Sequence, residues 1–388
     1  MYHYTPSSLP NTRVDAADIL RGIAIGGIVM LHFIEHMNFY NVPELTVLDR
    51  VVWDTMFFLC GGKMYAIFSL LFGLSFFIQH DNQAQKGKDF RLRFAWRMMW
   101  LMAFGLLDLL FFNGDILTVY AACGLLVLPL IRLSNKTLFW IALLLALQPI
   151  ELFYIVWGLM DPSVQPLNLG SGALFGALID AQSHGSWGDV AVGGIKYGFA
   201  INFLWAIENG RMTQTVFLFL LGILMGRTRY LYKEGDNPIR WVRTMVGAVM
   251  ALLLILPIQQ TLPGLVENRC VSHSLQVMLT MWRNLAMMLF IVSAVAWLFH
   301  CTERGKRLIV IAPYGKMSLT NYLGQSVIGG FVFYGWGLGL YQYSGHTMSL
   351  ALGAVCVLLQ FFFCRWWLAH HKRGPLEGLW RELTWLRS

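Results

Sequence analysis

The segment DILRGIAIGGIVMLHFIEH, residues 18 to 36, is long and apolar enough to cross a bilayer, yet it carries five ionisable side chains. At about 100° and ~1.5 Å per residue, they share one broad face of a helix. These side chains are Asp18, Arg21, His32, Glu35 and His36. Ionisable groups in a membrane helix face protein or water rather than lipid. The segment therefore predicts a membrane-spanning helix with a functional site along one face.

Composition places the rest of the chain in the membrane as well. Of its 388 residues, 57% are hydrophobic and 13% are charged, and the mean hydropathy is +0.56. About 20 apolar residues cross the hydrocarbon layer. We therefore expect an all-α integral membrane protein with about ten transmembrane helices. The ten apolar runs lie near residues 19–40, 55–79, 94–112, 115–132, 137–160, 213–228, 242–262, 276–300, 317–340 and 348–369.

Lysines and arginines predict the orientation, because they concentrate in cytoplasmic loops. With a cytoplasmic N-terminus, 23 of the 29 basic residues fall in cytoplasmic loops or at cytoplasmic helix ends. Both termini are therefore expected in the cytoplasm. Basic residues at the membrane surface also account for the net charge of +8. We therefore do not expect nucleic acid as a partner.

A single polytopic domain, residues 1–388, is expected from the absence of any soluble segment or low-complexity linker. Residues 190–207, VAVGGIKYGFAINFLWAI, are apolar, but a full crossing there would place the later basic clusters outside, so we expect an outer re-entrant or interfacial helix. The tail repeats leucines at helical spacing and predicts an amphipathic helix on the cytoplasmic leaflet. The expected parts are an N-terminal half with the site (13–160), an external loop (161–212), a C-terminal half (213–371) and a cytoplasmic interfacial tail (372–388).

Polar side chains in the other spans predict a wet cavity. Lys63 lies near the outer end of its span, where it either faces the cavity or extends its amine to the membrane surface. Asp108, Asn113 and Asp115 cluster at a tight outer turn, although Asp115 alternatively caps the helix that follows. Further polar groups in the outer half are Glu151, Glu208, Asn209, Arg283, Asn284, Asn321 and Gln325.

Common catalytic and transport motifs are missing from the sequence. It has no phosphate-binding loop, no HExxH pair, no GxSxG elbow and no TVGYG-type filter. The six cysteines form no CxxC pair. His32 and His36 with Glu35 form only a partial ligand set, so no metal is expected.

Five stretches of the chain resemble the YeiB family of bacterial membrane proteins, which is built around a domain of unknown function. They are DILRGIAIGGIVMLH (18–32), GGKMYAIFSLLFGLSF (61–76), NGDILTVYAACGLLVLP (113–129), LTNYLGQS (319–326) and GPLEGLWRELTW (374–385). The resemblance implies a multi-pass protein of the bacterial cytoplasmic (inner) membrane. The first-helix motif is also similar to that of the transmembrane acyltransferase superfamily, where an arginine and a histidine mark the active region. Those residues are Arg21 and His32 here, whereas many YeiB-type members have asparagine in place of His32.

The resemblance and the residues together give our leading hypothesis, a membrane acyltransferase. It would move an acyl group from a cytoplasmic acyl-CoA-type donor to a hydroxyl or amine on an envelope glycan or lipid. His32 would act as general base, with Glu35 or Asp115 orienting its imidazole. Arg21, helped by Arg97, would bind the phosphates of the donor.

The remaining candidate residues receive supporting roles in this hypothesis. Lys63 or Asn321 would stabilise the oxyanion. The other expected substrate- or donor-binding residues are Asp18, His36, Asp108, Asn113 and Gln325.

Two other functions fit the same residues. The first is a transporter or permease for a small polar or anionic solute, in which the charges form a proton relay. The second is a non-catalytic membrane receptor or partner subunit. The expected partners are membrane lipids and a small-molecule or glycolipid substrate, and no cofactor beyond an acyl-CoA-type donor is expected. The sequence sets no oligomeric state.

Overall fold

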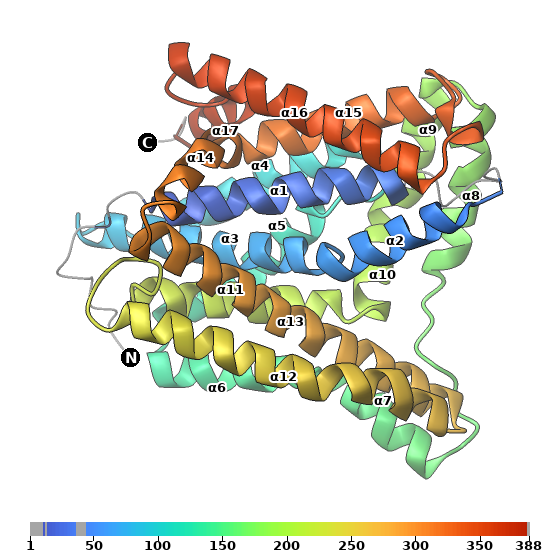
Figure 1. Cartoon of the computed structure of the whole chain (residues 1–388), viewed down its shortest axis with the longest axis horizontal. Coiled ribbons are helices and arrows are strands. Elements are labelled where there is room, and N and C mark those ends of the chain that lie inside the picture. Colours follow the sequence, from blue (N-terminus) through green and yellow to red (C-terminus); the bar gives the residue numbers. More distant parts are fainter. Residues whose placement is uncertain (1–10, 12–13, 36–43, 386–388) are drawn as a thin grey trace.

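The computed structural model describes residues 11, 14–35 and 44–385, and every regular element in these residues is a helix (Figure 1). The N-terminal part contains α1 (Asp15–Glu35), α2 (Val47–Leu59), α3 (Lys63–Ala84), α4 (Arg91–Asp108), α5 (Leu117–Val127), η1 (Leu128–Arg132), α6 (Asn135–Ala146) and α7 (Pro149–Met160). The middle contains α8 (Ser171–His184), α9 (Trp187–Gly193), η2 (Gly194–Gly198) and α10 (Phe199–Glu208). The C-terminal part contains α11 (Arg211–Arg227), α12 (Asn237–Leu265), α13 (Arg269–Cys301), η3 (Gly305–Ile311), α14 (Ala312–Lys316), α15 (Ser318–Phe333), η4 (Leu340–Gln342), α16 (His346–His370) and α17 (Pro375–Trp385).

Local sequence explains where several helices begin and break. Thr46 and Asp49 form a capping box that starts α2, because each side chain accepts a hydrogen bond from the other's backbone N–H. The predicted span 55–79 is interrupted where Gly62, at φ +76°, separates α2 from α3. Pro149 starts α7, which is bent by 45° relative to α6.

Six helical segments of the described residues are long and apolar enough to cross a membrane, and α6 with α7 makes a seventh if the bent pair is one span. The six are Asp15–Glu35, Val47–Ala84, Trp187–Glu208, Asn237–Leu265, Arg269–Cys301 and His346–His370. Fewer helices than the ten predicted meet these limits because α5, α11 and α15 have only 11, 17 and 16 residues. In addition, α4 carries three arginines within its 18 residues, which is too much charge for a helix that crosses the bilayer by composition alone.

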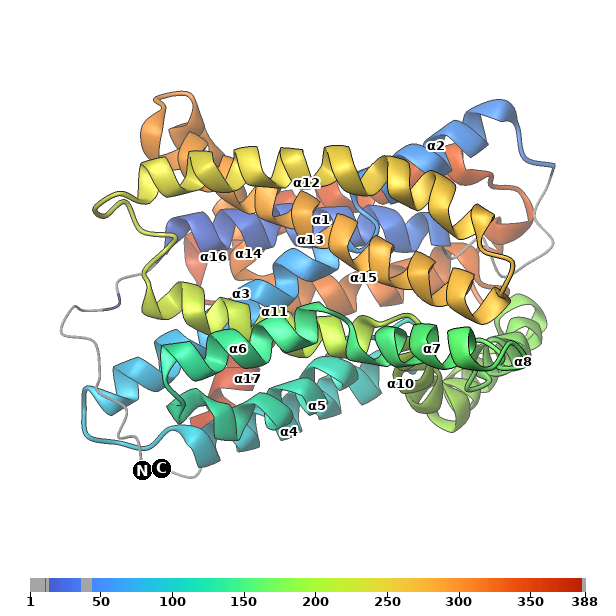
Figure 2. The same cartoon turned by 90° about the horizontal axis from the view of Figure 1, so that it is seen from below.

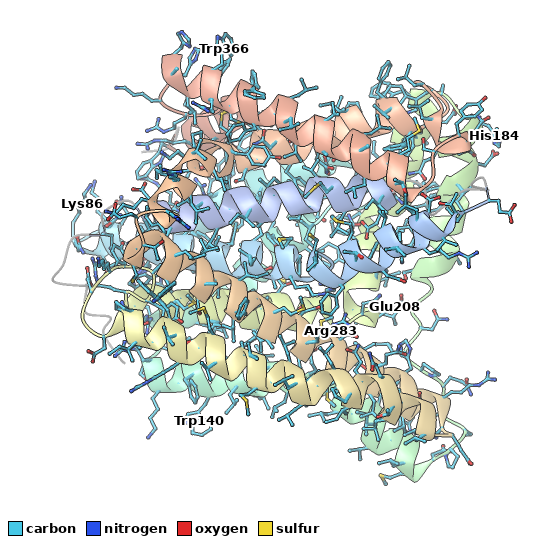
Figure 3. All side chains as sticks on the ribbon, in the orientation of Figure 1. Lys86, Trp140, His184, Glu208, Arg283 and Trp366 are labelled. Atoms are coloured by element: carbon cyan, nitrogen blue, oxygen red, sulfur yellow. The ribbon has the colours of Figure 1, made fainter. Side chains whose placement is uncertain are left out.

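The long helices lie side by side along one direction, and α8 to α10 gather at one end of the bundle (Figure 1). Figure 3 places Lys86 and His184 at opposite ends of the bundle. The loop that follows α3 and the segment containing α8 therefore lie at opposite ends, as the predicted topology requires. The compartment that each end faces stays a prediction.

The outer surface of the bundle is apolar. Figure 2 shows α12 along one edge, beside α13. In α12, Met250, Leu253 and Leu254 are 57%, 64% and 65% exposed, respectively. Exposed aliphatic side chains in this density suit lipid rather than water. The polar positions of α1 instead point inward, since α1 is packed against α3, α14, α15 and α16.

Glycines bring α3 and α11 into backbone contact. A Cβ at Gly73 would lie 2.1 Å from the carbonyl oxygen of Phe219, and one at Gly222 would lie 2.0 Å from that of Leu70. Small residues at such crossings let membrane helices approach closely and gain packing energy. This contact holds together two helices that form the candidate site.

The C-terminal helix α17 is docked on the protein. Trp380 donates to the carbonyl oxygen of Arg97 at 3.1 Å, and its ring lies 3.5 Å from the guanidinium carbon of the same residue. Glu377 accepts hydrogen bonds from the backbone N–H groups of Leu319 and Thr320 at 2.7 and 3.0 Å. The predicted helix is therefore present, but its aromatic face packs on α4 and its acidic residue satisfies free N–H groups at the start of α15.

We expect Glu377→Ala to lower the free energy of unfolding by about 1–2 kcal/mol, the usual effect of losing a helix cap. Burial raises the pKa of this carboxyl, so the neutral amide of Glu377→Gln, which keeps an acceptor oxygen, should be tolerated better. Thermal unfolding of the purified protein in detergent measures both variants. Equal destabilisation by the two substitutions would contradict the capping role.

Candidate functional site

A cavity of about 870 Å³ reaches into the bundle from the end where α8 and α10 lie. His32 and Glu35 of α1 line it, as do Asn113 and Asp115 of the turn between α4 and α5. The wall is completed by residues of α2, α3, α8, α10, α11, α13 and α15. The structure thus brings together residues that are up to about 290 positions apart in the sequence, as expected for a binding site between helices of a bundle.

His32 lies in the cavity wall in an aromatic setting. Its ring centroid is 4.9 Å from that of Phe112 and 6.0 Å from that of Tyr322. The side-chain amide nitrogen of Gln325 lies 2.9 Å from Nδ1 of His32. Gln325 is fully buried on α15, so it can hold the imidazole in a fixed orientation.

The sequence predicted that Glu35 or Asp115 orients the imidazole, and the structure shows Gln325 in contact with Nδ1. An amide can present its nitrogen or its oxygen at nearly the same position. With the oxygen toward the ring, Nδ1 carries the proton and Nε2 keeps a lone pair that can accept one. As placed, the amide nitrogen faces Nδ1, which would leave the ring proton on Nε2, and the opposite amide orientation is the one that suits a general base. The sequence predicted a substrate- or donor-binding role for Gln325, and the structure places it against His32, outside the residues that line the cavity.

Asp115 caps α5, which is the alternative role that the sequence left open for it. Its two carboxylate oxygens accept hydrogen bonds from the backbone N–H groups of Leu117 and Thr118, both at 2.9 Å. It thus stabilises the start of α5 while lining the cavity. Asn113 accepts a hydrogen bond from Gln182 of α8 at 3.1 Å. The polar cluster predicted at this turn therefore forms, except that Asp108 is buried and does not line the cavity.

Lys63 and Asn321, which were expected to stabilise an oxyanion, do not face the cavity. Lys63 is fully buried, and its ammonium donates to the carbonyl oxygen of Phe57 at 3.1 Å. Asn321 donates to the carbonyl oxygen of Tyr314 at 3.1 Å. Neither side chain lines the cavity. Lys63 satisfies a carbonyl group near the break between α2 and α3, and it does not extend its amine to the membrane surface.

The acidic and basic residues at the start of α1 are separated from the cavity. Arg21 donates to Asp18 at 2.7 Å and to Ser75 at 2.5 Å, and neither Arg21 nor Asp18 lines the cavity. The eleven-residue step from Arg21 to His32 spans about 16 Å along the helix. The predicted stripe is therefore split, and its connection into one continuous cavity is not seen here. His36 lies outside the described residues.

Arg97 does not approach His32 either. Its guanidinium group stacks on Trp380 at the opposite end of α4 from the 108–115 turn. This places Arg97 at the same end of the bundle as the start of α1.

The sequence analysis gave Arg211 no role, whereas it expected Arg283 and Asn284 among the polar groups of a wet cavity. All three line the cavity. Arg211 is the first residue of α11, directly after the Asn209–Gly210 turn, where it looked like a loop charge. The pair Arg283 and Asn284 inside an apolar span pointed to the cavity correctly, since such residues seldom face lipid.

In the described part of the chain, no group of three or more His, Cys, Asp or Glu side chains is placed to hold an ion, and His36 of the partial ligand set lies outside that part.

Two family models match separate parts of the chain. Residues 13–161 match the family described as heparan-alpha-glucosaminide N-acetyltransferase, catalytic. Residues 225–387 match the family described as protein of unknown function (DUF418). The fold and these matches define a multi-pass helical membrane protein with an acyltransferase-like N-terminal part.

Three relatives match nearly the whole chain. Uncharacterized protein YxaH of Bacillus subtilis (strain 168) is 27% identical over 98% of this chain and 96% of its own length. The uncharacterized 39.9 kDa protein in the amylase 3' region of Bacillus acidopullulyticus is 25% identical over 97% and 95%. Uncharacterized protein YeiB of Escherichia coli (strain K12) is 26% identical over 95% of each chain. The resemblance to the YeiB family is thereby confirmed.

Proposed function

We propose that this protein is a membrane acyltransferase that moves an acyl group from an acyl-CoA-type donor to a hydroxyl or amine on an envelope glycan or lipid. The observation that carries the proposal is the position of His32, which lies in a cavity wall within the part of the chain similar to an N-acetyltransferase catalytic domain. A histidine held at Nδ1 by a buried amide is suited to general-base catalysis.

The proposed reaction has two proton transfers. Nε2 of His32 takes the proton of the acceptor hydroxyl or amine as that atom attacks the thioester carbonyl carbon. The tetrahedral intermediate then expels the thiolate of the donor, which receives the proton from the imidazolium. The products are the acylated acceptor and a free thiol, and no oxidant or reductant is needed.

Asn113 and Tyr322 are better candidates for oxyanion stabilisation than Lys63 and Asn321, because they line the cavity with His32. The Asn113 oxygen accepts from Gln182, which leaves its NH₂ group to donate. The Tyr322 oxygen accepts from the backbone N–H of Ile116 at 3.0 Å, which leaves its O–H to donate. Donors of this kind stabilise the negative charge that develops on the carbonyl oxygen.

We place donor binding at the end of the bundle where α1 and α4 begin. Arg21 is fixed there by Asp18 and Ser75, and its side chain is 24% exposed. Arg97 is held on Trp380 at the same end. Guanidinium groups bind phosphate oxygens with paired hydrogen bonds, which suits the phosphates of an acyl-CoA.

We expect Arg21→Ala to raise the KM for the acyl donor about 10-fold or more with a much smaller change in kcat, because phosphate binding is made equally in the ground and transition states. Steady-state kinetics with acetyl-CoA as the donor measure this. Arg240→Ala, a change on the same predicted cytoplasmic side, serves as the control. An unchanged KM in Arg21→Ala would remove Arg21 from the donor site.

We propose ten crossings of the cytoplasmic (inner) membrane, with both termini in the cytoplasm. The proposal rests on the uneven division of basic residues and on the opposite positions of Lys86 and His184 in the bundle. Shorter helices such as α11 complete a crossing when packed against longer neighbours. Reporter fusions after Gly87 and Ser171 should report opposite compartments. Both reporters in one compartment would rule out this topology.

A further inference from the structure

Two arginines line the cavity and make no direct ion-pair contact in the described residues, although Glu35 interacts electrostatically with Arg211 over a longer distance. Arg211 starts α11, and its guanidinium carbon lies 5.0 Å from the ring centroid of Tyr65 and 5.8 Å from that of Trp205. Arg283 lies between the two ends of α13 (Figure 3) and donates to the amide oxygen of Gln259 at 3.2 Å. No ion pair of either residue occurs in the part of the chain that the structure describes.

Asn284, the neighbour of Arg283, is a second and independent sign of a binding site. It is fully buried, it lines the cavity, and neither its amide oxygen nor its amide nitrogen has a hydrogen-bond partner among the described residues. The Nε atoms of Arg211 and Arg283 are also without partners there. Buried polar groups left unpaired are destabilising unless a ligand or water completes them.

The backbone at Gly62 makes room for these groups. A Cβ at this position would lie 2.2 Å from the Asn284 amide nitrogen and 3.0 Å from a terminal nitrogen of Arg211. Gly62 also has φ +76°, which disfavours any larger residue. The break between α2 and α3 therefore places a side-chain-free stretch of backbone against the arginine and amide groups.

Acidic and basic side chains both line the cavity, and Arg211 and Arg283 are its basic groups. Glu35 lines the same cavity, Asp115 is committed to the start of α5, and Asp54 is exposed in the wall contributed by α2. Against these, the cavity wall carries Arg211 and Arg283, with the amine of Lys63 buried behind it. Cations inside a membrane protein are costly to keep unpaired and mark ligand or ion paths.

We propose that Arg211, Arg283 and Asn284 bind a carboxylate or phosphate group of the acceptor, so that the acceptor is an acidic sugar or a phosphorylated glycan or lipid. Guanidinium groups bind both anions through paired, charge-assisted hydrogen bonds. The anion would hold the acceptor in the cavity that also exposes His32. That the bound group belongs to an acyl acceptor rests on the proposed function, whereas the anion site rests on Arg211, Arg283 and Asn284.

The first test uses the unaltered full chain in detergent and needs no variant. Its thermal unfolding is followed with glucose, glucuronate or glucose 6-phosphate at constant ionic strength. We expect the two charged sugars to raise the Tm in a concentration-dependent way and glucose to leave it unchanged, because a ligand that binds only the folded state stabilises it. A stronger effect of one charged sugar identifies the carboxylate or the phosphate as the preferred group. Equal shifts with all three sugars, or no shift with any, would overturn the proposal.

The second test assigns the binding to the arginines. Arg211→Gln and Arg283→Gln should each weaken the binding of the effective sugar by about 10-fold or more, since each removes a charge-assisted pair. Arg269→Gln is the matched control, because Arg269 is an exposed arginine at the start of the same helix as Arg283. Unaltered affinity in both site variants would contradict the proposal even if the first test succeeded.

The two proposals fail in different ways. Arginine-dependent binding of the charged sugar without any acyl transfer would overturn the enzymatic function and leave the anion site standing. Acyl transfer that depends on His32 but accepts neutral and anionic acceptors equally, with no effect of the arginine substitutions, would overturn the anion site and leave the function standing.

Discussion

Replacing His32 by alanine should lower the rate of acyl transfer by about 10²- to 10⁴-fold, the range that general-base catalysis contributes, and leave the protein folded. That loss corresponds to about 2.7–5.5 kcal/mol of transition-state stabilisation. Folding should be little affected because His32 lies in a cavity wall and is only half buried. The measurement is transfer or hydrolysis of radiolabelled acetyl-CoA by the purified protein in lipid nanodiscs.

Two further variants separate catalysis from a general loss of structure. Gln325→Ala should lower kcat by about 10-fold and change the pH profile, because the imidazole would no longer be held at Nδ1. His370→Ala, an exposed histidine at the end of α16, should retain full activity. If the purified protein neither transfers nor hydrolyses the acyl group, and His32→Ala instead changes solute flux into liposomes, the protein is a transporter.

Replacing Gly222 by alanine should destabilise the bundle by about 3 kcal/mol or more, at the upper end of the cost of overpacking. The new methyl group would lie 2.0 Å from the carbonyl oxygen of Leu70 and 2.8 Å from the backbone nitrogen of Leu74. Both atoms belong to the backbone of α3, so no side chain can move aside and the two helices must separate. Thermal unfolding and resistance to protease in detergent measure the loss.

Gly247→Ala is the matched control for this packing prediction. Gly247 lies within α12, and a Cβ there meets no atom within 4 Å. Alanine at this position should be neutral or stabilising by up to about 1 kcal/mol, because alanine favours the helix over glycine. Similar destabilisation at both glycines would show that helix propensity, and not the contact of α3 with α11, governs the effect.

Features governed by composition and local spacing could be predicted from the sequence. The apolar runs predicted an all-helical membrane protein, and Pro375 with the leucine repeat predicted α17. The Asn113–Gly114 turn and the polar face of α1 placed Asn113, Asp115, His32 and Glu35 near one another, and all four line the cavity. These predictions succeeded because hydrophobic periodicity and turn chemistry act over a few residues.

The partners of each polar group depended on helices far apart in the chain. Gln325 reaches His32 across 293 positions, and Trp380 reaches Arg97 across 283. Lys63 had two expected orientations, yet it is turned toward Phe57 by the break at Gly62. No local pattern specifies which face of one helix meets which face of another.

Residue composition and spacing were therefore enough to predict a helical membrane protein with ionisable groups on an inward face of α1. Helix packing was needed to show that His32 contacts Gln325, that Arg21 lies outside the cavity of His32, and that Arg211 and Arg283 line it. The physical reason is that burial of a polar side chain requires a partner, while the identity of that partner is set by helix packing. That packing depends on close contacts such as the one between Gly73 of α3 and α11.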